Sequence, residues 1–279
     1  MTAAKKKFSA SKIIVPVLVV LWFLVCLVPF AFLILCTLKT QKEIMSNGVF
    51  SIPEAFNLSN YIDVFSGNIW HYFFNSVIVM VVSLLVLLLF SAFAAYPLSR
   101  WKFKLNKPIY ALIVACMSVP IHVTLLPLFM MMTNVGLYDS IWALIGPYVA
   151  FNLPVSTFIL TTFMATVPRD LEEAAGIDGC GRYGIFWRIM LPLVKPGLST
   201  LVIYDGVNIW NEFSFALTLT QTSVNRTLPL AVNEFQGQYT MNIPMIMTVL
   251  FITILPMIIV FIFFKDKLIE GMMAGAVKG

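Results

Sequence analysis

The chain has 279 residues, of which 60% are hydrophobic and only 11% charged, and its formal net charge is +5. An average soluble domain carries about 25% charged residues, so this composition excludes an ordinary soluble protein and indicates a chain solvated mainly by lipid. The four cysteines show no disulfide or zinc spacing. The basic residues cluster between apolar runs, which favours a membrane protein over one that binds nucleic acid.

Six apolar runs are long enough to cross a bilayer, which predicts an all-α integral membrane protein with six transmembrane helices. The runs cover residues 13–38, 72–98, 108–132, 140–166, 198–219 and 243–264. The first run is longer than the apolar region of a signal peptide, so we expect it to stay in the mature chain. We expect Pro120 and Pro127 to kink the third helix, and Gly146-Pro147 and Pro154 to interrupt the fourth. Such breaks face a cavity or are only packing kinks.

Lysines and arginines are distributed unequally between the segments that join these runs. Fifteen of the eighteen lie before the first run, at 100–107, at 169–195, or after the sixth run. Only Lys39, Lys42 and Arg226 lie in the other segments. Since cytoplasmic loops carry an excess of basic residues, we expect both termini and the loop after the fourth run to be cytoplasmic.

The polar stretch 169–192 separates the fourth and fifth runs and is too long for a minimal connection between spans. Asp170 and Glu173 have the spacing of a helix N-cap with its reciprocal acid, which predicts a short helix that starts at Leu171. Gly176 and Gly179 each offer a stop for this helix, and the turn at Gly179 needs a positive φ.

A second short helix fits residues 183–191, whose apolar side chains recur at helical spacing until Pro192. Two short helices joined at a glycine turn have the form of a docking element, although the spacing alone also allows a solvated connector. Gly179, Gly181 and Gly184 match the dinucleotide-binding fingerprint. No βαβ unit fits between two spans, so we discount a nucleotide site here.

The stretch contains Glu173-Ala174-Ala175, then Asp178-Gly179, then Ile189, Leu191 and Pro192. These residues resemble the EAA loop of permease subunits of bacterial binding-protein-dependent ABC importers. The flanking sequence, Trp210-Asn211-Glu212-Phe213 and the C-terminal Ala-Gly-Ala-Val-Lys-Gly are similar to the carbohydrate-uptake branch, the group of the smaller permease of the maltose transporter.

The resemblance implies type I importer architecture, with a cytoplasmic coupling-helix loop between helices four and five. The residues that it implies for coupling to the ATPase are Glu172, Glu173, Ala174, Ala175, Asp178 and Gly179. Gly275 and Lys278 would contact the ATPases from the C-terminal tail. The expected divisions are 1–70 (N-terminal cytoplasmic segment, first helix and outer segment), 71–265 (transmembrane core) and 266–279 (cytoplasmic C-terminal tail).

The resemblance also implies partners and a place in the bacterial cytoplasmic membrane. The partners would be a second, homologous permease subunit, two ATP-binding subunits, an extracytoplasmic solute-binding protein, a sugar substrate and membrane lipid, but no nucleic acid. The chain has no Walker A sequence, and His71 and His122 stand without metal-ligand or nucleophile motifs. We therefore expect a transport subunit and not an enzyme, with no cofactor of its own, because ATP and magnesium would bind the partner ATPase.

Two other classes of membrane protein fit the residues less well. An ion-coupled secondary transporter would more often show internal repeats, and it would leave the long polar loop unexplained. A structural scaffold would have spans without polar residues, which the fifth run contradicts. Which sugar is carried, and which permease contacts it, the sequence leaves open.

The fifth run carries a polar stripe within an apolar sequence. At about 100° per residue, Asp205, Asn208 and Glu212 fall within roughly 60° of one another, with Asn211 on the flank. Each acid costs roughly 2.5 to 3.5 kcal/mol near the membrane centre, so the stripe has to face protein or a hydrated cavity. We expect it to line the substrate path or to contact the partner permease. Asp205, about 10 Å from the inner end, fits an inner gate better.

Overall fold

The structure is a computed structural model that describes residues 11–236 and 241–276, with side chains from 14 to 265 within those ranges. Its contacts group the chain into two units, which are described separately. Unit 1 comprises Met1–Gly67 and Val232–Ile252, and unit 2 comprises Asn68–Ala231 and Thr253–Gly279. The divisions that the sequence predicts after residues 70 and 265 are not defined by these contacts, and they stay predictions.

Unit 1 contains the first predicted span and the segment that follows it. Its helices are α1 (Ser11–Thr37), α2 (Gln41–Asn47), α3 (Ser59–Ser66) and the first turns of α13 (Ile243–Ala276). α1 is apolar along its whole length and exposes nearly all of its described side chains. It has the length and composition to cross a membrane.

The segment after α1 is held by two buried polar residues. Lys39 is fully buried, and its Nζ donates to the Val49 carbonyl oxygen at 3.0 Å and to Ser51 Oγ at 3.1 Å. Asn60 donates from Nδ2 to the carbonyl oxygens of Thr37 and Lys39, both at 2.8 Å. The two bonds from Asn60 satisfy carbonyl groups at and just after the C-terminal end of α1 that have no partner within the helix, and those from Lys39 hold the 49–51 segment against it.

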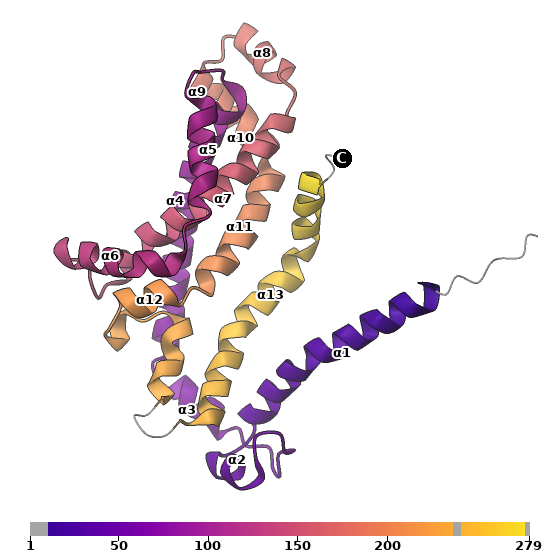
Figure 1. Cartoon of the computed structure of the whole chain (residues 1–279), viewed down its shortest axis with the longest axis vertical. Coiled ribbons are helices and arrows are strands. Elements are labelled where there is room, and N and C mark those ends of the chain that lie inside the picture. The colour runs from indigo at the N-terminus through magenta and orange to yellow at the C-terminus, as the bar shows by residue number, and fades with distance from the viewer. Residues whose placement is uncertain (1–10, 237–240, 277–279) are drawn as a thin grey trace, which may run out of the picture. The chain divides into compact units, whose positions relative to one another are not determined.

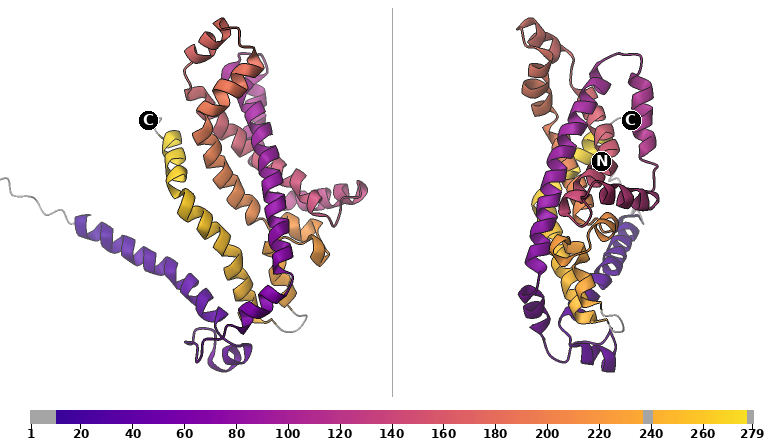
Figure 2. Two further views of the ribbon diagram at one scale, coloured as in Figure 1. Left: turned by 180° about the vertical axis from the view of Figure 1, so that it is seen from behind. Right: turned by 90° about the vertical axis from the view of Figure 1, so that its left-hand side faces the viewer.

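Unit 2 is a helical bundle with α4 and α7 packed along each other and α11 against both (Figures 1 and 2). Its elements are α4 (Ile69–Arg100), α5 (Asn106–Cys116), α6 (Ile121–Asn134), the 3₁₀ turn η1 (Ile141–Leu144), α7 (Ile145–Thr166), α8 (Asp170–Ile177), α9 (Arg182–Ile185), the π-helix η2 (Phe186–Met190), α10 (Leu191–Leu193), α11 (Lys195–Trp210), α12 (Ser214–Leu219), the 3₁₀ turns η3 (Ser223–Asn225) and η4 (Leu228–Phe235, continuing into unit 1), and the rest of α13. The packing of these helices fixes the positions of the loops and short helices at the two ends of the bundle.

Small residues let the central helices approach one another closely. Ala92 and Ala95 of α4 are buried in a cluster with Leu160 of α7 and Leu201 of α11. A side chain on Gly197 would place its Cβ 2.7 Å from Phe163 Cγ, closer than packed carbon atoms approach. In a membrane, where van der Waals packing replaces the hydrophobic effect between helices, such close contacts hold the bundle together.

The described residues are compatible with the predicted six spans but do not fix that number. Four helices are long and apolar enough to cross a membrane, or up to six if each of two bent pairs counts as one span. The bent pairs are α5 with α6, and α9–α10 with α11. The second and sixth predicted spans are single helices, and α13 continues to Ala276.

The third span is not one kinked helix, as expected, but two helices bent by 95°. α5 ends at Cys116, and α6 begins at Ile121 directly after Pro120. Proline lacks an N–H and clashes with the preceding turn, so Pro120 ends the first helix outright. Pro127, by contrast, is accommodated inside α6.

The expected interruptions of the fourth span are also wrong. α7 runs without a break from Ile145 to Thr166. Pro147 lies in its first turn, where the missing N–H has no intrahelical partner to lose. Pro154 lies inside the helix and is buried, so neighbouring helices cover this site.

Candidate functional site

The polar stretch 169–193 forms two short helical segments at one end of unit 2 (Figure 1), here called the α8–α9 element. The predicted start of the first helix was one residue late. Arg169 is the N-cap, and Asp170 lies inside the first turn without a capping hydrogen bond. An acid in the first turn still stabilises the helix through its dipole. Of the two predicted glycine stops, Gly179 is confirmed, because it has φ +79° just after the helix, whereas Gly176 lies inside α8 and does not end it.

The second helical segment is longer and less regular than expected. It starts at Arg182, passes through the π-helix η2 and continues past Pro192 to Leu193. Pro192 does not end the helix because it lies in the first turn of α10, a position that proline tolerates.

Glu172 fastens the α8–α9 element to the end of α4. Its Oε1 lies 2.7 Å from Arg100 Nε, and its Oε2 accepts from the Tyr96 hydroxyl at 3.1 Å. Arg100 also donates to the Val167 carbonyl oxygen at 2.7 Å, just beyond α7. Only 4% of the arginine side chain and 17% of the glutamate side chain are exposed. The ion pair therefore joins α8 to α4, and the second bond of Arg100 links this pair to the segment that follows α7.

Aromatic side chains make a second attachment. The Arg182 guanidinium lies 5.2 Å from the ring centroid of Trp101, within the range of a cation–π contact. Phe186 stacks on Phe93 of α4 at 5.2 Å and contacts Tyr96 at 5.3 Å. Both segments of the α8–α9 element thus pack on the same end of α4.

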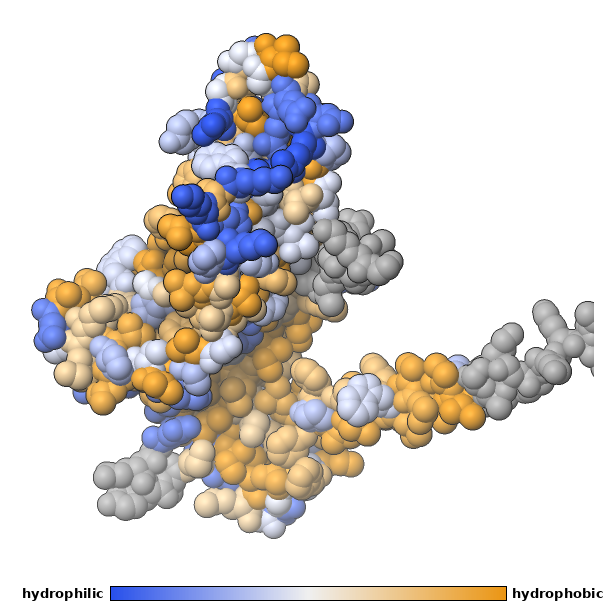
Figure 3. Space-filling view, turned by 45° about the horizontal axis from the view of Figure 1, so that its top comes forward, coloured by the Kyte–Doolittle hydropathy of each residue, from blue (hydrophilic) through white to orange (hydrophobic). Residues whose placement is uncertain are grey.

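The outward face of the element carries most of the residues implied for coupling. Glu173, Ala174, Asp178 and Gly179 are exposed, Ala175 is half-buried, and Glu172 faces α4 instead. Ile177 and Tyr183 are 87% and 83% exposed, and the sequence analysis missed both. The sequence did contain a signal for their exposure, because a large apolar residue next to a polar turn has no hydrophobic core to pack into. Figure 3 shows hydrophilic side chains gathered at this end of the unit, above a mainly apolar face.

The polar stripe expected along the fifth span does not form. α11 ends at Trp210, so Glu212 lies in a break before α12. Its Oε1 accepts from the Phe215 N–H at 2.8 Å, and its Oε2 accepts from the Ala216 N–H at 3.2 Å and the Tyr148 hydroxyl at 2.8 Å. Glu212 therefore caps α12 and ties it to α7.

The other members of the stripe are separated from Glu212. Asp205 is buried against α7, with Oδ2 2.8 Å from Ser156 Oγ. Asn208 and Asn211 are exposed, and Asn211 Nδ2 donates to the Val207 carbonyl oxygen at 2.9 Å. Their assignment to a substrate path stays a prediction, which the exposed amide of Asn208 fits and the buried carboxyl of Asp205 does not.

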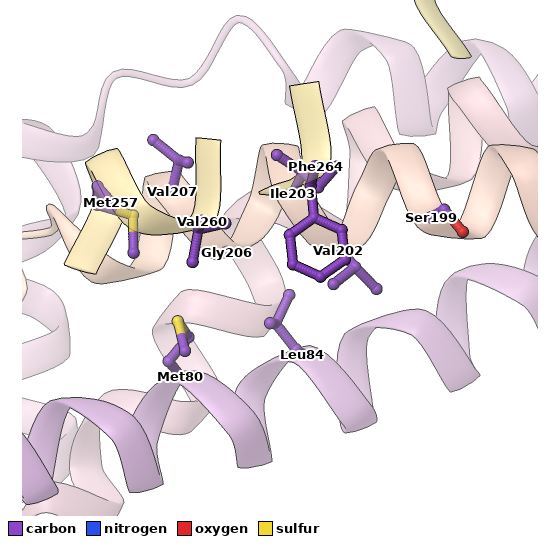
Figure 4. A pocket seen from close by; sticks show the side chains of 10 residues that line it. All are labelled: Met80, Leu84, Ser199, Val202, Ile203, Gly206, Val207, Met257, Val260 and Phe264. Carbon is purple, nitrogen blue, oxygen red and sulfur yellow. The ribbon is translucent and has the colours of Figure 1, made fainter. Parts of the chain in front are cut away.

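A cavity of about 260 Å³ lies between α4, α11 and α13 (Figure 4). Its lining includes Met80, Leu84, Val202 and Phe264, and Ser199 is the one hydroxyl among the lining side chains. A sugar needs several hydrogen-bonding partners, so this cavity is unsuited to one. Within the described residues, no three His, Cys, Asp or Glu side chains meet in a way that could hold a metal ion.

Gly275 and Lys278 are the two tail residues that the resemblance implies for contact with the ATPases. Gly275 belongs to the last turn of α13, and Lys278 lies outside the described residues. Both assignments stay predictions.

Comparison with known proteins gives consistent results. Residues 87–272 match the family described as binding-protein-dependent transport system inner membrane component. A protein named as an ABC transporter permease, ORF2 of Caldicellulosiruptor sp. (strain Rt8B.4), is 48% identical over 92% of this chain and 94% of its own length. The sulfoquinovosyl glycerol transport system permease protein SmoH of Agrobacterium fabrum is 37% identical over 91% of this chain and 89% of its own length.

A solved structure has the same fold. It is a crystal structure of a bacterial ABC transporter involved in import of the acidic polysaccharide alginate. The match covers 95% of this chain and 99% of that one, with a TM-score of 0.80 and 19% sequence identity. The helical order described above is therefore shared with an ABC importer.

Proposed function

The chain belongs to the family of binding-protein-dependent transport system inner membrane components, and from this we propose that it is the permease subunit of an ATP-driven importer of a sugar or oligosaccharide. The named substrate of the SmoH relative, a sugar glycoside, supports the substrate class. The subunit crosses the bacterial cytoplasmic membrane, with both termini inside. It conducts the substrate and leaves ATP hydrolysis to a partner.

The partners follow from this assignment. A second, homologous permease completes the pathway, two ATP-binding subunits hold ATP and magnesium, and an extracytoplasmic solute-binding protein delivers the sugar. The family description, which names dependence on a binding protein, supports the last of these.

The observation that carries the coupling role is the α8–α9 element. It is fastened to α4 through Glu172, yet it exposes Ile177 and Tyr183 on its outward face. Large apolar side chains exposed beside acids and a glycine turn suit a protein–protein contact. An ATPase seated there moves α4 and α7 through the Arg100–Glu172 pair, so that hydrolysis closes one mouth of the pathway and opens the other.

Two substitutions test the coupling role. Glu173→Lys reverses an exposed charge on the docking face, and Gly179→Val strains a turn with φ +79°. We expect both variants to insert into the membrane but to lose ATPase subunits on purification and to lose sugar uptake in reconstituted vesicles. Gly181→Ala is the matched control, because Gly181 has φ −67° and open space around its Cβ position. Wild-type uptake by both variants would remove the coupling role.

A further inference from the structure

A strongly basic hollow of about 670 Å³ lies where α4 ends and α5 begins. Its lining includes five cationic residues: Arg100, Lys102, Lys104, Lys107 and Arg169. None of the residues that line it is acidic. Five like charges around one hollow repel one another unless an anion joins them.

Only one of these cations is neutralised by a neighbouring side chain. Arg100 pairs with Glu172. Within the described side chains, no carboxylate lies within 4.0 Å of the three lysines or of Arg169. All four are exposed. The hollow therefore carries an uncompensated positive charge, and the proposed transport function assigns no role to its lysines.

The hollow is preformed. Asn106 Nδ2 donates to the carbonyl oxygens of Leu98, at 3.0 Å, and Trp101, at 2.9 Å, which fixes the short link between α4 and α5. A ligand that enters here does not have to order this link first, so less of its binding energy is lost.

We propose that this hollow binds the phosphate headgroup of an anionic phospholipid in the inner leaflet. Basic pockets next to membrane helices on the cytoplasmic side bind such headgroups. The link also places half-exposed Phe103 between Lys102 and Lys104, and aromatic and basic side chains together anchor protein segments at the membrane interface. A free phosphate or an acidic peptide does not account for Phe103, whereas the neighbouring Trp101 is already engaged by Arg182.

The site adjoins the coupling element. Arg100 lines the hollow and also holds Glu172. A headgroup phosphate beside Arg100 competes for that guanidinium, so the lipid composition adjusts how firmly α8 is attached to α4. This regulatory consequence rests on the proposed coupling role, and the choice of the inner leaflet rests on the proposed topology, whereas binding of an anionic headgroup by the hollow rests on neither.

The test uses the assembled importer in nanodiscs of phosphatidylcholine with or without phosphatidylglycerol. Phosphatidylglycerol retained by the complex is counted by native mass spectrometry, with ATP hydrolysis measured in parallel. In the variant that combines Lys102→Gln, Lys104→Gln and Lys107→Gln, we expect the affinity to fall by up to about a hundredfold, at roughly fivefold for each lysine removed. The wild-type affinity itself falls with added salt, because the interaction is electrostatic.

Two matched variants interpret the result. Lysine to arginine at the same three positions keeps the charge and retains the lipid. Lys265 is an exposed lysine that does not line the hollow. We expect Lys265→Gln to leave lipid retention unchanged. Equal retention in the neutral variant and the wild type overturns the proposal. So does loss of the ATPase subunits with lipid retention unchanged, since the hollow is then a contact with the ATPase.

Discussion

The ion pair between Arg100 and Glu172 is formed away from bulk water. Removing one partner of a buried pair costs about 3 to 5 kcal/mol, because the remaining charge stays desolvated. We expect Glu172→Ala to lower the thermal stability of the assembled importer and to raise the ATP hydrolysed per sugar transported. Both quantities are measurable in reconstituted vesicles.

Two further variants separate this pair from a general effect of acid removal on α8. Glu173→Ala removes the neighbouring, exposed acid, so it should weaken ATPase docking but leave the thermal stability of the permease subunit itself unchanged. The exchange of Arg100→Glu with Glu172→Arg should recover part of the lost coupling. A stability loss of equal size for Glu173→Ala would contradict the attachment role of Glu172.

Asp139 ties the segment before α7 to the loop after α12. Its Oδ1 accepts from the N–H groups of Gln221 at 2.8 Å and Thr222 at 2.9 Å, and from the Thr222 hydroxyl at 3.1 Å. Burial raises the pKa of this carboxyl, but the hydrogen bonds outweigh burial and leave the pKa below its ordinary value. Asp139 also has φ 56°, a region that Asn and Asp tolerate better than other side chains.

A lowered pKa in the folded state gives stability that is present above the unfolded value, about 3.9, and is lost as the pH falls through the folded value. We therefore expect the loop to stay closed at neutral pH and to open only below the usual range for aspartate. Hydrogen exchange of the Gln221 and Thr222 amides measures this opening. Asp139→Asn keeps an acceptor oxygen and should cost under about 1 kcal/mol, whereas Asp139→Ala should cost at least about 2. Equal protection in both variants would contradict the assignment.

At the scale of helices, local signals in the sequence were only partly reliable, and long-range signals were absent. The turn at Gly179 formed as predicted. Three prolines, by contrast, did not interrupt their helices: Pro147, Pro154 and Pro192. Gly179 predicted its turn because only glycine readily adopts a positive φ there. Glu172 and Glu173 lie about 100° apart on a helix, and which of them faces inward depends on Arg100, far away in the chain. The sequence therefore predicted the α8–α9 element but not its attachment.

The break between α11 and α12 was missed for a related reason. Residues 198–219 read as one apolar run, and no proline or glycine marks positions 211–213. The break is stabilised instead by the Glu212 carboxylate, which accepts from two N–H groups of α12 and from Tyr148. A capping contact with a distant tyrosine leaves no periodic signal in the sequence.

Glu212→Leu should therefore act on structure before it acts on transport. It leaves the Phe215 and Ala216 N–H groups and the Tyr148 hydroxyl without their acceptor, and loss of a cap alone costs about 0.5 to 2 kcal/mol. We expect a lower yield of assembled complex, measured by co-purification of the subunits.

Asn208→Leu is the companion variant. Its amide is exposed on α11, so we expect normal assembly with lower sugar uptake or a changed sugar preference. If Glu212→Leu assembles normally and only transport falls, the capping role is secondary to substrate contact. Unchanged uptake in both variants would remove these residues from the pathway.

For the whole molecule, the unequal distribution of basic residues predicts orientation, and the structure shows which positions can report it. Asn60 is buried and bonded to two carbonyl groups, and Asn106 bridges two more, so a cysteine at either would disturb the fold. Ser46 and Ser223 are exposed in the segments assigned to the outside. Lys104 and Asp178 are exposed in segments assigned to the inside.

Single cysteines at these four positions, in a background without Cys26, Cys36, Cys116 and Cys180, therefore test the topology. Fifteen of the eighteen basic residues fall on the side assigned to the cytoplasm, and such an excess retains loops inside during insertion. We expect an impermeant thiol reagent to label Ser46→Cys and Ser223→Cys in intact cells, and to label Lys104→Cys and Asp178→Cys only after the membrane is opened. Labelling of Asp178→Cys from outside would place the α8–α9 element out of reach of any cytoplasmic ATPase, and the coupling role would fall with the topology.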